Sequence, residues 1–317
     1  MTTLSTVLED FHLGGTPEPV WHQRYRQLSP GRMSSRLQQA GSGRLRLYGK
    51  WMSERVVQQG CVPPGRICIA VLGGSGSCTL PPRAQGRELP NNALLVLQAG
   101  EEFHLQRPPG MELLSISVER EAFAGLLDAA GGSPRAWASP VLQAAPERLE
   151  HLRMRLRAAL DTESPASPLA IFAALQALLV NAGATRQALG SASASYLVAQ
   201  CHRIVAESGT AAPGIDALCT RLRTSRRSLQ NAFRQVTGLS PVEYLRGLRL
   251  NLVRQRLVET PAAQLNIATA AAAQGFEQMS HFGARYRALF GELPSQTRRG
   301  SDQGPAASSS PAGIGGP

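Results

Sequence analysis

Between Arg44 and Val118 the chain alternates short apolar runs with breaks that contain glycine and proline. Four such runs stand out: RLRLYGKWM, RICIAVLGG, NALLVLQAG and MELLSISV. Apolar runs of this length, bounded by turn residues, are typical of strands in small antiparallel folds. The pattern therefore predicts an α+β protein that begins with a cupin-like β-barrel or sandwich.

From Glu119 the pattern changes to longer segments rich in Ala, Leu and Arg. We expect EAFAGLLDAA, PERLEHLRMRLRAAL and PLAIFAALQALLVNAG to be helices that add a helical layer to the β-domain. The middle segment carries an amphipathic stripe with the three-and-four spacing of a helix face, formed by Leu149, Leu152, Leu156 and Leu160. The stripe either covers the sheet or pairs with a partner helix in a homodimer, and the pattern leaves both interpretations open.

The C-terminal region contains one pattern twice, about 50 residues apart. In both copies an apolar residue, an aromatic residue, a glycine and a proline follow in the same register: Leu229, Phe233, Gly238 and Pro241, then Phe282, Tyr286, Gly291 and Pro294. The apolar residue and the aromatic residue four positions later form one face of a helix. The glycine marks the end of that helix, and the proline opens the next one.

Each copy follows a short helical segment and a polar turn, IDALCTRLRT in the first and NIATAAAAQGF in the second. Helix, turn and second helix form the unit that places its second helix in the major groove of DNA. Between the copies, Ser240-Pro241-Val242-Glu243 is a capping box that opens a helix running to about Val258. Such a helix is roughly 27 Å long and could hold two reading helices about one DNA turn, or about 34 Å, apart. The sequence thus predicts an all-α domain with two helix-turn-helix units.

Positive charge is concentrated in this region. From Tyr196 to Arg299, 14 arginines less six acidic residues leave +8 of the total formal charge of +11. A basic domain favours a polyanionic partner, because neutralisation of phosphates drives binding to nucleic acids. Composition alone leaves nucleic acid and membrane headgroups as alternatives.

The 317 residues suffice for two domains. We expect disorder in residues 1–18 and 300–317, a cupin-like domain in residues 19–190 with helices from about residue 119, and the double helix-turn-helix in residues 191–299. We find no apolar stretch long enough to span a membrane and no signal-peptide pattern, so we expect a cytoplasmic protein. The five cysteines are scattered without CxxC spacing, which argues against a zinc site or a disulfide framework.

The two segments SRRSLQNAFRQVTGLSPVEYLRGLRL, from Ser225 to Leu250, and GFEQMSHFGARYRALFGELPS, from Gly275 to Ser295, resemble the AraC/XylS transcription regulators. Within that family SRRSLQNAF, RLNLVRQRL and QLSPGRMSSRL are most similar to ethanolamine-operon activators. The resemblance implies a double helix-turn-helix joined by a long helix, with double-stranded DNA and RNA polymerase as partners. It also implies that the N-terminal domain senses a small-molecule effector, or dimerises, and that the protein is an activator.

Ser225 is the expected cap of the first recognition helix. The resemblance implies base contacts near Arg227, Gln230 and Asn231, with Arg226 and Arg234 on phosphates; a solvated basic helix face is the alternative. In the second recognition helix the corresponding contact residues are Met279, Ser280 and His281, backed by Arg285 and Arg287. Many members of the family have an arginine where this chain has Ala284. We therefore expect the first unit to dominate specificity and the second to add backbone contacts.

Catalysis is not indicated by the N-terminal region. His104, beside Glu101 and Glu102, is the one histidine among the predicted strands, whereas a cupin metal site uses two or three imidazoles. We find no GxSxG, HExxH or GxxxxGK[ST] motif. We therefore expect a protein that is not an enzyme and requires no metal or cofactor, with His104 as an ordinary strand residue.

A β-barrel fused to a DNA-binding domain is suited to bind a small molecule and to shift an equilibrium between states with different DNA affinity. Trp51, Cys68, Leu95 and Phe103 are candidate pocket residues, with plain core positions as the alternative. No ligand chemistry follows from them. The likeness to ethanolamine-operon activators would make ethanolamine with a cobalamin cofactor the candidate effector. A domain that only dimerises or docks a protein partner is the competing hypothesis.

Overall fold

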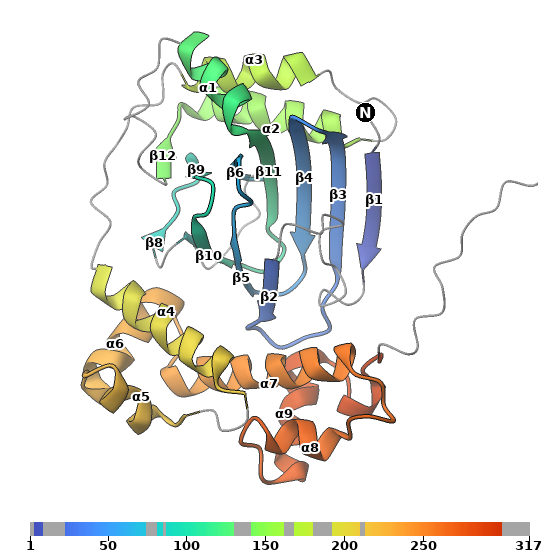
Figure 1. The fold of residues 1–317 in the computed structure, drawn as a ribbon, viewed down its shortest axis with the longest axis vertical. Coiled ribbons are helices and arrows are strands. Elements are labelled where there is room, and N and C mark those ends of the chain that lie inside the picture. Colours follow the sequence, from blue (N-terminus) through green and yellow to red (C-terminus); the bar gives the residue numbers. More distant parts are fainter. Residues whose placement is uncertain are drawn as a thin grey trace, which may run out of the picture.

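The computed structural model describes residues 3–8, 23–73, 81–84, 87–129, 141–161, 168–179, 192–209 and 213–299. Within these residues the N-terminal part is a sandwich of two antiparallel sheets, and the C-terminal part is all helical (Figure 1). The predicted α+β fold, a β-barrel or sandwich with a helical layer followed by a helix-turn-helix domain, is confirmed.

The larger sheet has seven strands in the order β1-β3-β4-β11-β6-β9-β12. Their bounds are Thr3–Leu8, Ser35–Ser42, Leu45–Met52, Glu112–Glu119, Arg66–Leu72, Ala93–Leu97 and Val141–Gln143. The smaller sheet has the order β2-β5-β10-β7-β8, with bounds Gln23–Gln27, Val56–Cys61, Glu102–Arg107, Arg83–Ala84 and Arg87–Glu88. The four apolar runs of the sequence correspond to β4, β6, β9 and β11.

Strand β1 differs from the prediction that residues 1–18 are disordered. Thr3–Leu8 pairs antiparallel with β3 in the register Thr3 to Ala40 and Leu8 to Ser35. A strand in this position supplies hydrogen-bond partners to the edge of the larger sheet, which would otherwise be open. The segment TLSTVL is short, and half of its residues are Ser or Thr, so it gives little apolar signal. The remaining residues of the predicted N-terminal segment, and the predicted tail from residue 300, lie outside the described residues.

Helices α1 (Arg120–Ala129), α2 (Pro146–Leu160) and α3 (Pro168–Leu179) cover the outer face of the larger sheet (Figure 1). The leucine stripe of α2 is at most 1% exposed and belongs to the same apolar cluster as Leu114 and Ile116 of β11. Arg153 of α2 donates from Nε to the carbonyl oxygen of Leu72, at 2.6 Å. Of the two interpretations of the stripe, the structure supports the one in which it covers the sheet.

The C-terminal helices are α4 (Ala192–Glu207), α5 (Ile215–Arg221), α6 (Arg226–Thr237), α7 (Pro241–Glu259), α8 (Ile267–Ala272) and α9 (Met279–Phe290). They enclose two apolar clusters, and α7 belongs to both. Its first half gives Tyr244, Leu245 and Leu248 to the cluster around α6. Its second half gives Val253 and Leu257 to the cluster around α9. The long helix predicted between the two copies therefore forms part of both cores.

The smaller sheet packs its outer face against these helices. Val57 of β5 lies in the apolar cluster around α6. Gln106 of β10 donates from Nε2 to the carbonyl oxygen of Val236, at 3.1 Å, and Arg55 donates to the carbonyl oxygen of Thr237. Val236 and Thr237 are the last residues of α6, whose carbonyl groups have no partner inside the helix. The N-terminal domain therefore caps the C-terminal end of α6.

Strand β2 makes the corresponding contact to α7 and α9. The backbone N–H of Gln27 donates to Oδ1 of Asn251 at 2.8 Å, and Nδ2 of Asn251 donates to the carbonyl oxygen of Gln27 at 2.9 Å. The side chain of Gln27 donates from Nε2 to the carbonyl oxygen of Leu289 at 2.6 Å, and the N–H of Gly31 donates to the same oxygen at 3.1 Å. Gly291 has φ +72, and a Cβ there would meet the backbone nitrogen of Arg32 at 2.8 Å. The end of α9 is thus held as closely as the end of α6.

We predict that Asn251→Ala loosens the two domains. The change leaves the N–H and C=O of Gln27 unpaired in a buried position, at about 1–3 kcal/mol for each group. The free energy of domain separation should fall by about 2–6 kcal/mol. Calorimetry should then show two separate unfolding transitions, whereas the unaltered chain should show one coupled transition. Arg256→Ala, at an exposed position of the same helix, is the control and should leave the transitions coupled. Coupled transitions in both variants would contradict the role of Asn251.

Candidate nucleic-acid interface and inner pocket

The first helix-turn-helix unit has well-formed helix ends. Ser225 caps α6 as expected, since its Oγ accepts a hydrogen bond from the N–H of Ser228 at 3.0 Å. At the other end Gly238 adopts the left-handed conformation, with φ 68, and its N–H donates to the carbonyl oxygen of Arg234. A residue with a Cβ is strained in this conformation, which explains the glycine.

Helix α6 has one apolar face and one polar face. Leu229, Ala232, Phe233 and Val236 are buried. The five residues expected to contact DNA all lie on the exposed side: Arg226, Arg227, Gln230, Asn231 and Arg234. Side chains with this donor and acceptor chemistry, projected from one face, are suited to contact base edges and phosphates.

Arg226 differs from the other four because it is already paired. Its Nε and Nη2 donate to the two carboxylate oxygens of Asp216 on α5, both at 2.5 Å. The hydrogen bond and charge of Asp216 raise the pKa of Arg226 above its usual value. The pair ties α5 to the start of α6, and because both side chains are mostly exposed, a phosphate group competes with Asp216 for the guanidinium.

The second unit has a weaker helix start. Gln278 occupies the cap position of α9 but makes no side-chain cap hydrogen bond. Phe282, Tyr286, Leu289 and Phe290 are buried, while the expected contact residues are exposed: Met279, Ser280, His281, Arg285 and Arg287. Ala284 is exposed among them, so this helix presents fewer groups that hydrogen-bond to bases.

The distance between the units depends on α7. Its capping box is present as predicted: Ser240 Oγ accepts from the N–H of Glu243 at 3.3 Å, and Glu243 Oε2 accepts from the N–H of Ser240 at 2.9 Å. The helix has 19 residues, about 28 Å at 1.5 Å per residue. Near the C-terminal end of α7, Arg254 forms a largely buried ion pair with Glu292, at 2.5 Å, and so connects α7 to the segment after α9. The spacing of the two recognition helices is therefore set by one continuous rigid element.

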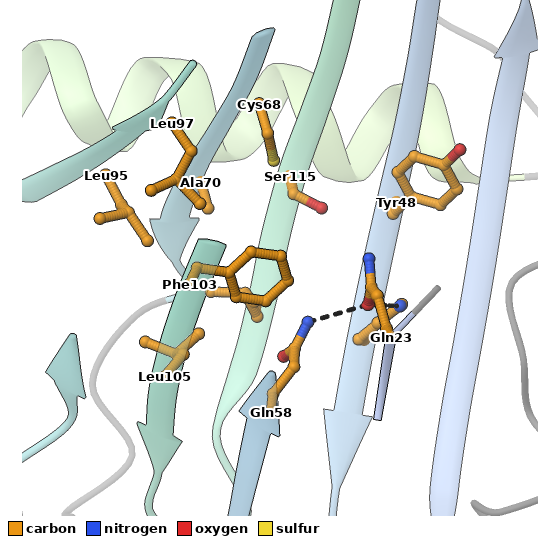
Figure 2. Close-up of a pocket in the computed structure, with 12 residues that line it drawn as sticks. Gln23, Tyr48, Gln58, Cys68, Ala70, Leu95, Leu97, Phe103, Leu105 and Ser115 are labelled. Atoms are coloured by element: carbon orange, nitrogen blue, oxygen red, sulfur yellow. Dashed lines mark hydrogen bonds between the residues drawn. The ribbon is translucent and has the colours of Figure 1, made fainter. Parts of the chain in front are cut away.

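A pocket lies between the two sheets (Figure 2). Its walls are apolar at one end, where Leu95, Leu97 and Phe103 gather, and polar at the other, where Gln23 and Gln58 are joined by a hydrogen bond. The remaining lining residues are Tyr48, Lys50, Cys68, Ala70, Leu105, Leu113 and Ser115. The space left for the centre of a water molecule is about 20 Å³, which is room for one water.

Three of the four residues suggested for a pocket, Cys68, Leu95 and Phe103, line it, and Trp51 does not. Successive side chains of a strand point to opposite faces. On β4, Tyr48 and Lys50 face the pocket, and Trp51 therefore points the other way. The polar residues of the pocket, Gln23, Lys50 and Gln58, were missed by the sequence analysis. One signal was available, because Lys50 is the single lysine of an arginine-rich chain.

The polar end of the pocket carries buried positive charge. Burial, and to a lesser degree the charge of Arg107, lowers the pKa of Lys50 to about 7. Burial likewise lowers the pKa of Arg107, to about 10. Burial raises the pKa of Cys68 to about 12, so this thiol is not a nucleophile at neutral pH.

His104 lies on the outer face of β10, at the boundary between the domains. Its Nδ1 is 3.3 Å from Nε2 of Gln59, and its ring centroid is 5.9 Å from that of His202 on α4. The Nδ1 of His202 is hydrogen-bonded to the hydroxyl of Tyr244 at 2.9 Å. Burial lowers the pKa of His104 to about 4, and burial together with Arg26, His104 and Arg24 lowers that of His202. Both imidazoles are neutral in the folded protein.

Within the described ranges, the His, Cys, Asp and Glu side chains form no group of three that would hold a metal ion. In the same part of the chain no helix combines the length and apolar character needed to cross a membrane.

Comparison with known proteins places the strongest similarity in the C-terminal helices. A family model described as "Helix-turn-helix domain" matches residues 218–300, about a quarter of the chain. The XylDLEGF operon transcriptional activator of Pseudomonas putida is 35% identical over 85 residues, which are 27% of this chain and 26% of that protein. For the transcriptional regulator CdhR of Pseudomonas aeruginosa the values are 38% over 81 residues, 26% and 23%. The chain spans about a quarter of the length of these curated relatives, and both are named as regulators or activators of transcription.

Among solved structures, the AraC-like transcriptional activator CuxR aligns over 79% of this chain and 94% of its own, with 16% identity and a TM-score of 0.37. A transcriptional regulator from Chromobacterium violaceum, with an AraC-type DNA-binding domain, aligns over 32% of this chain and 85% of its own, with 30% identity and a TM-score of 0.28.

We predict that acid weakens the protein through His104. A histidine whose pKa is lower in the folded state than in the unfolded state is protonated more readily in the unfolded state. The folded protein therefore keeps its full stability above about pH 6.5 and loses stability as the pH falls towards 4. The shift corresponds to about 3 kcal/mol of unfolding free energy. In denaturant titrations at pH 7, 6 and 5, His104→Gln should show a shallower decline than the unaltered protein, whatever its stability at pH 7. Equal slopes would show that His104 does not carry the effect.

We also predict that the two recognition helices respond in opposite ways to changes at their caps. Ser225→Ala removes the cap of α6 and should lower the stability of the helical domain by about 1 kcal/mol. Gln278→Ser supplies the missing cap of α9, where the backbone is already extended, and should raise it by a similar amount. Thermal unfolding of the full chain measures both changes. A destabilising Gln278→Ser would mean that the start of α9 is held by contacts other than a cap.

Proposed function

We propose that this protein, whose C-terminal part is a helix-turn-helix domain of the AraC/XylS type, is a sequence-specific DNA-binding transcriptional regulator, an activator that responds to a small-molecule effector. The observation that carries the proposal is the exposed face of α6. It projects Arg227, Gln230, Asn231 and Arg234 beside the turn of a unit that matches the helix-turn-helix family. A solvated basic surface needs no such pair of units spaced by a rigid helix.

The two recognition helices have unequal parts in this proposal. Because α6 carries arginine and amide side chains, it supplies direct base contacts. Because α9 carries Ser280 and His281 at its start and two arginines behind them, it supplies mainly phosphate contacts, which fix position without reading sequence. Arg226 joins the phosphate contacts after it is released from Asp216.

The N-terminal domain is proposed to sense the effector. The support is a pocket with an apolar wall and a few convergent polar groups, the combination typical of small-molecule sites. The competing hypothesis, a domain that only dimerises or docks a protein partner, gives no reason for buried polar groups between the sheets. Homodimerisation, contact with RNA polymerase and a cytoplasmic location remain part of the proposal.

Ethanolamine with cobalamin fits the pocket poorly as the effector. The one charged side chain among the described lining residues is Lys50, which repels the ethanolammonium cation. A corrinoid is far larger than a space that admits one water. The chemistry of the pocket points to another class of ligand.

We predict that Arg227→Ala reduces sequence discrimination. Loss of one bidentate base contact, about 1–3 kcal/mol, should weaken binding of the full chain to DNA from upstream of its own gene by about 10- to 100-fold. Binding to random DNA should change much less. Fluorescence anisotropy at two salt concentrations measures both affinities, and each should fall as salt rises.

The matched control is Arg203→Ala, which removes one positive charge from an exposed position of α4. It should weaken both kinds of DNA only slightly. Equal affinity of the unaltered chain for its upstream DNA and for random DNA would refute the proposed function.

A further inference from the structure

The polar end of the pocket directs three hydrogen-bond donors at one oxygen atom. Oε1 of Gln23 accepts from Nζ of Lys50 at 2.8 Å, from the hydroxyl of Tyr25 at 2.5 Å and from Nε2 of Gln58 at 3.0 Å. An amide oxygen has two lone pairs and no full charge. Three donors, one of them on a lysine, are the surroundings expected for a carboxylate oxygen.

The charge of Lys50 has no counter-ion among the described lining residues, which include no aspartate or glutamate. Beyond them, the charge of Glu112 acts on Arg107, but Glu112 is already paired with Arg157. Arg107, 1% exposed, lies beside Lys50 and donates from Nη2 to the carbonyl oxygens of Lys50 and Met111, but its Nε and Nη1 have no partner. Buried cations without an anion are costly. A bound anion offsets that cost.

Gln58 contributes a donor to this end of the pocket through Nε2, which now reaches Gln23 at 3.0 Å. Gln58 is 4% exposed, and its Oε1 is buried without a donor, a need that a carboxylate does not meet and a water molecule does. Leu95 and Leu97 lie on the side away from the two glutamines, with Phe103 between, and the wall also includes Tyr48 and Ser115 (Figure 2). A ligand that suits both ends has one anionic group and a short apolar body.

We propose that the pocket binds a small monocarboxylate whose carboxylate takes the position of Gln23 Oε1 between Lys50, Tyr25 and Gln58, while its apolar part lies against Leu95, Leu97 and Phe103. This proposal rests on the proposed function, since it names the class of the effector. Gln23 swings out to make room, and the carboxylate then accepts the three hydrogen bonds that Oε1 of Gln23 gives up.

Displacement of Gln23 acts on the DNA-binding domain through β2. Gln23 and Tyr25 hold the pocket end of this strand, and Gln27, two residues further, holds Asn251 and the end of α9. A ligand that moves Gln23 therefore changes the grip of the same five-residue strand on α7 and α9. Because coupling between two sites is reciprocal, the carboxylate changes DNA affinity by the factor by which DNA changes carboxylate affinity.

The test is isothermal titration of the full chain with acetate and butyrate, beside butyramide, 1-butanol and butylamine as uncharged and cationic probes. At least one acid should bind, and its amide or alcohol analogue should bind at least tenfold more weakly. Between pH 7 and 9 the affinity for the acid should fall by about tenfold per pH unit, since binding requires the ammonium form of Lys50, whose pKa is about 7 without ligand.

Variants separate the proposed contact from general effects. Lys50→Met and Lys50→Gln should each lose at least tenfold in affinity, with folding checked by thermal unfolding. Gln23→Ala should bind several-fold more tightly, because it removes the competing oxygen; a merely structural Gln23 would give weaker binding. Arg44→Ala removes an exposed charge just before β4, the strand that holds Lys50. This control variant should bind the acid as the unaltered chain does.

The proposal is overturned if no acid binds, if butyrate and butyramide bind equally, or if the Lys50 variants bind unchanged. DNA affinity measured with and without saturating acid tests the coupling: a change of at least threefold that disappears in Lys50→Met supports it, and no change overturns it. Sequence-specific DNA binding by the same preparation without acid tests the proposed function separately, so the two failures are distinguishable.

Discussion

The side chain of Asn251 on α7 hydrogen-bonds to the free edge of β2 in the way that a neighbouring strand would. Edge strands present unpaired N–H and C=O groups, and β2 uses one edge for β5 and directs Gln27 at the amide of Asn251 on the other. Because α7 belongs to the cores of both helix-turn-helix units, this pair of hydrogen bonds registers the β-domain against the whole DNA-binding domain. The contacts to the ends of α6 and α9 depend on the register that Asn251 sets.

One face of the smaller sheet lines the pocket and the other packs against the helices. Along β10, Phe103 and Leu105 line the pocket, while His104 and Gln106 face the helices. Between the pocket and the recognition helices there is thus a single layer of backbone. A shift of one strand of the smaller sheet therefore moves groups on its pocket face and on its helix face together. In the proposed function this is the physical basis for linking ligand binding to DNA affinity.

Sequence patterns predicted the parts of the fold that carry a clear apolar signal. The strands β4, β6, β9 and β11 are buried on both faces and read as nearly continuous apolar runs. The helices α1 to α3 and α5 to α9 were also expected, with Ser225 and Ser240 marking two helix starts, whereas α4 was not. The strands of the smaller sheet give a weaker signal, because both faces of that sheet are partly polar. Strands such as QRYRQ and EFHLQR place glutamine, arginine and histidine against the helices and in the pocket, so they show little contrast between apolar and polar positions.

The candidate site divides in the same way. The exposed residues of α6 follow from helix periodicity once Leu229 and Phe233 are known to face inward. The convergence of Gln23, Tyr25, Lys50 and Gln58 was not predicted, because it depends on how β2 and β5 of the smaller sheet face β4 of the larger one. Trp51 was a candidate pocket residue that does not line the pocket. Neighbouring residues of a strand point to opposite faces, and the pairing of β4 in the larger sheet decides which face points inward.

The close approach of Arg32 to Gly291 has a consequence for how such proteins change over time. The end of α9 is shaped to fit the loop around Arg32 of the β-domain, so the two halves are not interchangeable modules. A β-domain transplanted from a relative would have to bring its own backbone path to position 291 and its own strand to position 251. Substitutions inside the pocket or on the exposed face of α6 leave this fit intact, whereas exchange of a whole domain does not.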